Sequence, residues 1–232
     1  MQKEVKKTLD LGKYEGEDKV ISSYELKLKY SGEKASPKIW SNIPSLDKYT
    51  CGFEPGELIS ISGPTKSGKT LLAQTLTYQF SKKQEFSTWF SFEVPARQFL
   101  TQFPDLPLFY MPSKLKAHVM PWIEERILEA HAKYRSRTIF IDHLHFLFDM
   151  AQSRNTSLQI GTVIRALKRI AVDNEFVIFL LCHTHKNKGD DSITYENIRD
   201  SSFVAQESDS VFMIRRDPSL GENAAKLSVE FH

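Results

Sequence analysis

The chain has 232 residues, a formal net charge of +2 at pH 7 and two cysteines. That length suffices for one large α/β domain, or for one domain with an extension. The small net charge excludes a polycation, so any contact with nucleic acid has to come from a local basic patch. No apolar run approaches the roughly twenty residues that a membrane span needs, no secretory signal opens the chain, and two cysteines form no disulfide framework, so we expect a cytoplasmic protein without a membrane partner.

The N-terminal segment, residues 1–39, alternates lysine with acidic residues and contains little that can build a core. Within it, residues 24–30 alternate as a strand does, but their apolar side chains also fit one side of a short helix. The sequence leaves both structures open. We expect residues 1–39 to form a charged extension or linker, either a solvated tail or an arm that docks on a neighbouring subunit, and residues 40–232 to form the folded domain.

A glycine-rich segment at residues 63–70 has the spacing G-x-x-x-x-G-K-[ST] of a phosphate-binding P-loop. It follows an apolar run at 58–61 that is typical of a buried strand, and it precedes apolar residues at helical spacing. Glycines let the loop curl so that successive N–H groups point inward, and the N-terminus of the following helix favours an anion. A chance glycine-rich turn is the alternative, but the flanking strand and helix favour the P-loop. The sequence therefore predicts that the protein binds a nucleoside triphosphate.

Two side chains of this loop have separate expected roles. Lys69 should reach the β- and γ-phosphates and assist catalysis, and the Thr70 hydroxyl should ligate Mg²⁺. The expected nucleotide-binding residues of the loop are Gly63, Pro64, Thr65, Lys66, Ser67, Gly68, Lys69, Thr70 and Leu71.

Short β-rich runs alternate with helical patterns through the rest of the chain. Pro121 suits the first turn of a helix, and residues 158–172 place their apolar side chains on one helical face. Nearly apolar strands that alternate with helices predict an α/β fold with a mostly parallel central sheet and helices on both faces. Ligands of such sheets bind beyond the carboxyl ends of the strands. The expected strands after the P-loop are 87–92, 106–111, 138–142, 176–182, 211–214 and 227–231.

Three polar side chains follow these strands. Asp142 is a candidate Mg²⁺ ligand together with Thr70, the alternative being a turn former or helix cap. Glu93 is a candidate for orienting and deprotonating the attacking water, the alternative being an exposed loop carboxylate. His183 is a candidate contact of the γ-phosphate, the alternative being a histidine of the core.

Two His-x-His pairs, His143/His145 and His183/His185, also lie at strand ends. Alternation places both members of a pair on one face if the strand continues. Imidazole suits zinc, so a zinc site is an alternative use of these residues. It is disfavoured because no cysteine or carboxylate completes a known ligand spacing.

Six segments, in this order, resemble the ATPase domain of DnaB-type hexameric replicative helicases. They are GFEPGEL (52–58), the P-loop, SFEVP (91–95), IDHLH (141–145), CHTHK (182–186) and IRDSSFVAQESD (198–209). The histidine at 183 resembles the phage helicase–primase and mitochondrial Twinkle branch, where bacterial DnaB has glutamine. The resemblance covers about Ile43 to the C-terminus and implies a RecA-like P-loop NTPase fold.

The resemblance also implies roles for single residues. Glu93 matches the catalytic glutamate, Asp142 the Walker B aspartate and His183 the γ-phosphate sensor. Arg216 matches an arginine that packs on the nucleotide base in the phage branch.

Two loops, 149–157 and 184–194, match the channel loops that track single-stranded DNA in this family. Their expected phosphate contacts are Arg154, Lys186 and Lys188. Two aspartates at 190 and 191 weaken this basic patch, and neither loop offers an aromatic stacking platform. The expectation of DNA binding therefore depends on the resemblance.

The implied function is Mg-ATP hydrolysis that drives translocation on single-stranded DNA during replication. The implied assembly is a homo-hexamer with a primase as a further partner, in a cytoplasmic, mitochondrial or phage-encoded setting. The family's arginine finger follows the strand that matches 227–231, so we expect a C-terminally truncated domain. Arg199-Asp200-Ser201 departs from the family's Arg-Gly-Ser or Arg-Glu-Ser.

Two alternatives remain from the sequence. One is a RecA-, RadA- or KaiC-like ATPase, disfavoured because the chain lacks a Cys-x-x-Cys finger and a second P-loop. The other is a nucleotide-gated scaffold or loader that hydrolyses poorly and unwinds nothing.

Overall fold

The computed structural model describes residues 11–32, 36–116, 119–147, 156–184, 202–222 and 224–231. The chain divides into two compact units, Met1–Ser36 and Pro37–His232. None of the helices in these described ranges is both long and apolar enough to cross a membrane.

The first unit contains a short 3-10 helix, Leu11–Lys13, and helix α1, Ser23–Ser31. Residues 24–30, for which the sequence left a strand or a helix open, form part of this helix, because its first turn is capped. Ser22 Oγ accepts a hydrogen bond from the Glu25 N–H at 3.2 Å, and the Glu25 carboxylate accepts one from the Ser22 N–H at 2.9 Å. No residue of α1 is buried.

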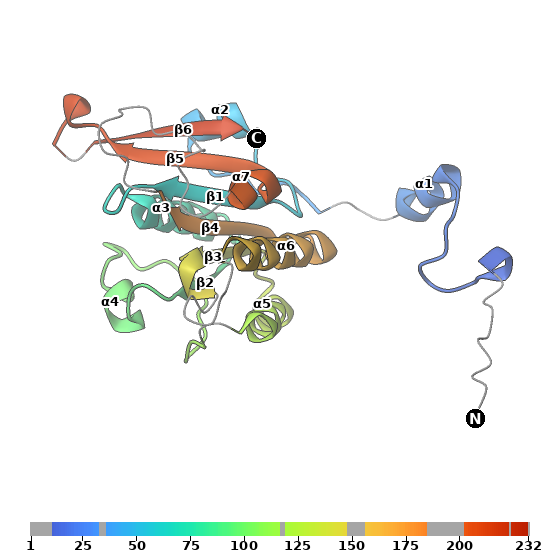
Figure 1. Cartoon of the computed structure of the whole chain (residues 1–232). Helices are drawn as coiled ribbons and strands as arrows, with labels where there is room; N and C mark the ends of the chain where they lie inside the picture. The colour runs from blue at the N-terminus through green and yellow to red at the C-terminus, as the bar shows by residue number, and fades with distance from the viewer. Residues whose placement is uncertain are drawn as a thin grey trace. The chain divides into compact units, whose positions relative to one another are not determined.

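The second unit is built on a six-stranded sheet in the order β2-β3-β4-β1-β5-β6 (Figure 1). Strands β1 to β5 are parallel, and β6 is antiparallel to β5. This arrangement confirms the mostly parallel sheet expected from the alternation of strands and helices. The strands are β1 Leu58–Gly63, β2 Ser87–Ser91, β3 Thr138–Asp142, β4 Val177–His183, β5 Ser210–Arg216 and β6 Ala225–Phe231.

Helices cover both faces of this sheet (Figure 1). One core forms between the sheet and α5, α6 and α7, and a second forms between the sheet and α2, α3 and α4. Pro121 lies in the first turn of α5, as expected from the sequence. The helices are α2 Pro44–Thr50, α3 Lys69–Lys82, α4 Ala96–Leu100, α5 Met120–Tyr134, α6 Thr156–Asn174 and α7 Ser202–Glu207, with 3-10 turns at Leu144–Leu147 and Pro218–Leu220.

The alternation of strand side chains supplies the two cores. In β3, Ile139 and Ile141 enter the core with α5 and α6, whereas Phe140 enters the core with α3. Phe140 stacks on Trp89 with ring centroids 4.8 Å apart and on Phe179 at 4.7 Å. This aromatic stack ties β2, β3 and β4 together, the three strands whose ends carry the candidate catalytic residues.

The expected strand at 106–111 is wrong. Only Tyr110 meets the sheet, as an isolated parallel bridge to Thr88. Its N–H donates to the Ser87 carbonyl oxygen and its carbonyl oxygen accepts from the Trp89 N–H, both at 2.8 Å. Pro112, the next residue that would face β2, has no N–H to donate, so the pairing does not continue beyond Tyr110.

Truncation of the central aromatic ring, Phe140→Ala, should lower the free energy of unfolding by about 3–5 kcal/mol, because the ring is fully buried between two others. Urea unfolding followed by circular dichroism measures this. Tyr49→Ala is the control, since Tyr49 is 70% exposed and its loss should change stability by about 0.5 kcal/mol or less. Equal effects of the two substitutions would contradict the packing described here.

Candidate nucleotide-binding site

The P-loop connects β1 to α3, and its shape requires glycine at both ends. Gly63 has φ +157°, and a Cβ there would lie 2.1 Å from the Ile214 carbonyl oxygen. Gly68, which precedes α3, has φ +108°. These two positions let the loop pass close to β5 and then turn into α3, whose N-terminus favours an anion.

Lys69 is buried beneath this loop, with 6% of its surface exposed. Its Nζ donates hydrogen bonds to the carbonyl oxygens of Gly63 and Pro64, both at 2.9 Å. Burial lowers the pKa of the ammonium, and the charges of Asp142 and Glu93 oppose that change. An ammonium has three donors, so one N–H remains for a phosphate oxygen at the loop.

Asp142 joins the end of β3 to the P-loop. Thr70 Oγ1 donates a hydrogen bond to Asp142 Oδ2 at 2.8 Å, and Asp142 is only 1% exposed. Burial raises the pKa of the carboxyl to about 6, Glu93 adds to this, and the Thr70 hydrogen bond and Lys69 act against it. A hydroxyl and a carboxylate oxygen held side by side are the ligand types that Mg²⁺ prefers, so these two residues fit the ion.

Glu93 lies two residues beyond β2, and its loop is fixed to the end of β3. The N–H groups of Phe92 and Glu93 donate to the Asp142 carbonyl oxygen at 2.7 and 3.3 Å. The Glu93 side chain is 42% exposed, so a water molecule can reach the carboxylate. Its position at the neighbouring strand end makes it a candidate base for a water molecule near the phosphates.

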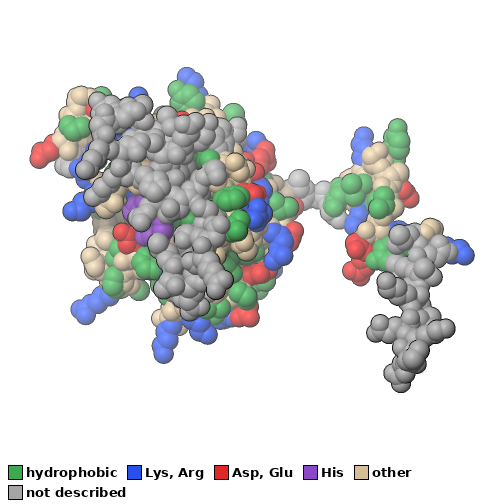
Figure 2. Space-filling model, viewed as in Figure 1, with side chains coloured by type: hydrophobic (Ala, Val, Ile, Leu, Met, Phe, Trp, Pro, Cys, Tyr) green, Lys and Arg blue, Asp and Glu red, His purple; other side chains and the backbone are tan. Residues whose placement is uncertain are grey.

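Two histidines converge on this carboxylate. Glu93 Oε2 lies 4.0 Å from His143 Nε2 and 3.9 Å from His183 Nε2. His183 ends β4 and His143 follows β3, so three neighbouring strands deliver the three side chains. Figure 2 shows histidine side chains beside an acidic side chain on this face of the molecule. Sequence reasoning assigned His143 no catalytic role, although its place directly after Asp142 is the signal that it lies at the site.

Arg216 also reaches the P-loop. Its Nε donates a hydrogen bond to the Lys66 carbonyl oxygen at 3.0 Å, which places the end of β5 against the loop. Within the described residues, the buried Ser67 Oγ makes no hydrogen bond, so a polar atom of the loop is available to a ligand. Thr65, Lys66 and Leu71 are exposed.

The expected DNA contacts, Arg154, Lys186 and Lys188, lie outside the described residues, as does His185. They therefore stay predictions from the resemblance.

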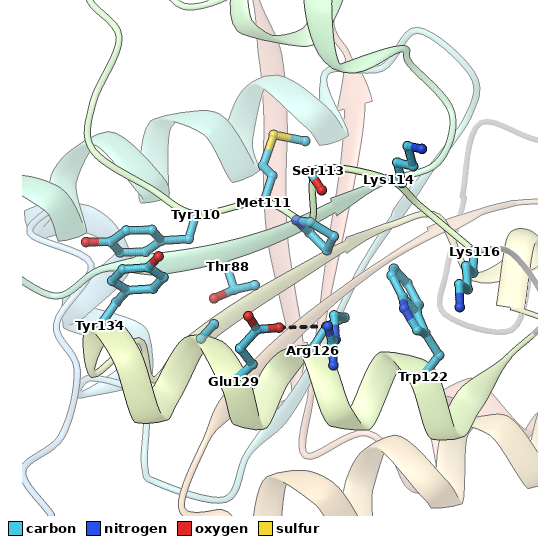
Figure 3. A pocket seen from close by; sticks show the side chains of 12 residues that line it. Thr88, Tyr110, Met111, Ser113, Lys114, Lys116, Trp122, Arg126, Glu129 and Tyr134 are labelled. Carbon is cyan, nitrogen blue, oxygen red and sulfur yellow. Dashed lines mark ion pairs between the residues drawn. The ribbon is translucent and has the colours of Figure 1, made fainter.

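A separate cavity of about 380 Å³ lies beside the outer edge of β2 (Figure 3). Tyr110 and Tyr134 stack at its rim with centroids 3.9 Å apart, and Arg126 pairs with Glu129 in its wall. None of the described P-loop or strand-end residues lines it, so it is not part of the nucleotide-binding site.

Comparison with known proteins identifies the family of the chain. The family described as "DnaB-like helicase C terminal domain" matches residues 39–104 and 108–230. The chain is 23% identical to the replicative DNA helicase DnaB of Pasteurella multocida (strain Pm70), over 89% of this chain and 52% of that protein. It is 20% identical to the replicative DNA helicase DnaB of Haemophilus influenzae (strain ATCC 51907 / DSM 11121 / KW20 / Rd), with the same coverage of 89% and 52%. The chain thus spans about half the length of these curated relatives.

Two solved structures share the fold. One, described as an ATPase domain, superposes with a TM-score of 0.74 at 16% identity, covering 90% of this chain and 88% of that one. The other, described as a DnaB-like replicative helicase and its interactions with primase, gives a TM-score of 0.74 at 17% identity, covering 94% of this chain and 63% of that one. The RecA-like ATPase fold expected from the sequence is confirmed, and the family match spans most of the chain. The chain belongs to the family of DnaB-like helicase C-terminal domains.

Proposed function

We propose that this chain is the motor domain of a replicative DNA helicase, which hydrolyses Mg-ATP to move along single-stranded DNA. The observation that carries the proposal is the hydrogen bond from Thr70 to Asp142, because it joins the P-loop to the next acidic strand end in the arrangement that a P-loop NTPase uses for its metal ion. The family membership supports the same activity.

Each described residue has one task in this reaction. The P-loop N–H groups and Lys69 hold the phosphates and offset their charge. Mg²⁺, when bound at Thr70 and Asp142, neutralises charge that develops on the β- and γ-phosphate oxygens. Glu93 orients a water molecule and takes its proton, and His183 senses the γ-phosphate from the neighbouring strand end. Arg216 packs on the nucleotide base.

The assembly and partners of the complete protein belong to the same proposal. The relatives are named replicative DNA helicases, and one solved relative is described with its primase interactions. We propose a homo-hexamer that encloses single-stranded DNA, with Arg154, Lys186 and Lys188 on the DNA and a primase as a partner. In such a head-to-tail ring each subunit presents the same pair of complementary surfaces to its neighbours.

The rival function, a nucleotide-gated scaffold, makes a different prediction about DNA. A motor couples hydrolysis to its track, so ATP turnover should rise when single-stranded DNA is added to the assembled protein. A scaffold shows no such rise, and a flat response in the assembled protein would favour it.

Lys69→Ala should abolish detectable ATP binding and leave the fold intact, because the substitution removes the buried ammonium that offsets phosphate charge. Calorimetric titration with Mg-ATP measures the affinity. Lys83→Ala, which removes an exposed lysine at the other end of the same helix, is the matched control. Retained affinity in Lys69→Ala would remove the basis for the P-loop assignment.

Glu93→Gln should leave ATP binding unchanged and lower turnover by about 10²-fold or more, as the loss of a general base does. Glutamine keeps the size of the side chain but cannot accept the proton. Glu125→Gln makes the same chemical change at an exposed carboxylate on α5 and should have no effect. If both variants turn over at the wild-type rate, Glu93 is not the base.

Asp142→Asn should stabilise the metal-free protein while removing Mg²⁺ binding. The folded state raises the pKa of Asp142 from 3.8 to about 6, so it retains a proton that the unfolded chain has already released. The stability that this proton contributes is lost as the pH rises from 3.8 to about 6. Above that range the buried carboxylate is charged and lowers the free energy of unfolding. Asparagine carries no charge, so the free energy of unfolding should rise by about 1–3 kcal/mol at neutral pH.

The gain should disappear below the ordinary pKa of 3.8, where both states of the wild-type protein are protonated. Urea unfolding at neutral and acidic pH without Mg²⁺ checks this. A gain of the same size at both pH values would show that the buried charge is not its cause.

A further inference from the structure

The cluster of Glu93, His143 and His183 has the composition of a metal centre. The ligand atoms of the three residues all lie within 4.8 Å of one another. Both histidines approach through Nε2, at 4.0 and 3.9 Å, and both distances end on the same oxygen, Glu93 Oε2. Two imidazoles and one carboxylate are a ligand set that zinc and other divalent transition metals use in sites with an open coordination position.

We propose that Glu93, His143 and His183 bind a divalent transition metal ion, for which Zn²⁺ is the probe, at a site distinct from the Mg²⁺ position between Thr70 and Asp142. The ion holds the carboxylate that otherwise activates water, so its binding suppresses ATP hydrolysis. This regulatory consequence rests on the proposed function, whereas the binding itself does not.

The two distances that end on Glu93 require only a small contraction. Zinc bonds of 2.0–2.2 Å place two ligands of a tetrahedral ion about 3.4 Å apart. The two distances to Glu93 Oε2 exceed that value by about half an ångström, and the ligand atoms of the two histidines lie within 4.8 Å of each other. Glu93 has the most exposed side chain of the three, at 42%. The histidine side chains are 12% and 17% exposed and their rings meet edge to face with centroids 4.5 Å apart, so the fold holds both imidazoles in place.

The residues around this cluster favour a divalent cation and influence which histidine nitrogen can bind it. Asp142, which directly precedes His143, adds a second carboxylate, and its carbonyl oxygen accepts from the Glu93 N–H. Lys69 instead donates to the carbonyl oxygens of Gly63 and Pro64. Both the backbone N–H and the Nδ1 of His145 lie 3.3 Å from His143 Nδ1. The His145 N–H donates to His143 Nδ1, which places the ring proton of His143 on Nε2. Metal on Nε2 moves this proton to Nδ1, which then donates to His145 Nδ1 instead of accepting from the backbone, the kind of support that ligating histidines have.

The ligands come from three different strands, which is why the sequence disfavoured a zinc site. It offered two His-x-His pairs without a carboxylate at a known spacing. The structure uses one histidine from each pair and takes the carboxylate from Glu93, about fifty residues before His143 in the chain.

Titration of the nucleotide-free chain with Co²⁺ tests the binding. We expect one equivalent to bind with the visible absorption of a four- or five-coordinate ion, and Zn²⁺ to displace it. His143→Asn and Glu93→Gln should each weaken this binding by at least about tenfold, because even residues that only support a ligand contribute about 10–100-fold. His131→Gln, which removes an imidazole at the end of α5, is the control and should bind as the wild type does.

Thermal unfolding of each variant shows whether it is folded, and Glu93→Gln decides the matter if His143→Asn is not, because Glu93 is an exposed loop residue. An unchanged affinity in the folded ligand variants, or an equal loss in His131→Gln, would overturn the proposal. A second arm measures ATP turnover with Mg²⁺ present, relative to each protein's own rate. Zn²⁺ should lower the wild-type rate and spare His143→Asn. Co²⁺ binding without any effect of Zn²⁺ on turnover would overturn the regulatory consequence alone.

Discussion

The parallel alignment of β1 to β4 is the constraint on which the site depends. Parallel strands present their carboxyl ends at one edge of the sheet, so the P-loop after β1 and the polar residues after β2, β3 and β4 meet there. The Thr70–Asp142 hydrogen bond and the Phe92 and Glu93 contacts with the Asp142 carbonyl oxygen then fix their spacing. The geometry of the candidate site thus follows from the strand register, and the aromatic stack around Phe140 packs β2, β3 and β4 against one another inside the core.

The same edge concentrates charge in a buried place. Asp142 and Lys69 are almost inaccessible to water, and burial disfavours the charged form of each: it raises the pKa of the carboxyl and lowers that of the ammonium. In the proposed function, a bound phosphate supplies negative charge beside the ammonium and a bound metal ion supplies positive charge beside the carboxylate. Burial of Asp142 and Lys69 therefore lowers the stability of the ligand-free protein, while it holds both groups in position for a ligand. Such a relation between stability and function is usual at functional sites.

The sequence predicted the fold well where local pattern and tertiary environment agree. The apolar runs of β3 and β4 and the amphipathic pattern of α6 could be recognised directly, and the P-loop spacing correctly predicted a loop between a strand and a helix. A local sequence pattern does not show which strands are neighbours in the sheet. The approach of His143, after β3, to Glu93, after β2, could therefore not be predicted. The local pattern at 106–111 predicted a strand wrongly, because proline lacks the backbone N–H that a paired strand needs. For α1, the capping box formed by Ser22 and Glu25 was the decisive signal, and its serine lies just outside the ambiguous segment 24–30.

The bridge at Tyr110 has a consequence for the outer edge of β2. An exposed edge strand offers unpaired N–H and C=O groups to any other extended chain and is a common starting point for aggregation. Here Tyr110 takes the Trp89 N–H and the Ser87 carbonyl oxygen, and Pro107 and Pro112 flank it with backbone nitrogens that cannot donate. This irregular segment therefore protects the edge of β2 from pairing with another molecule, because it occupies hydrogen-bonding groups of β2 without forming a regular edge strand itself.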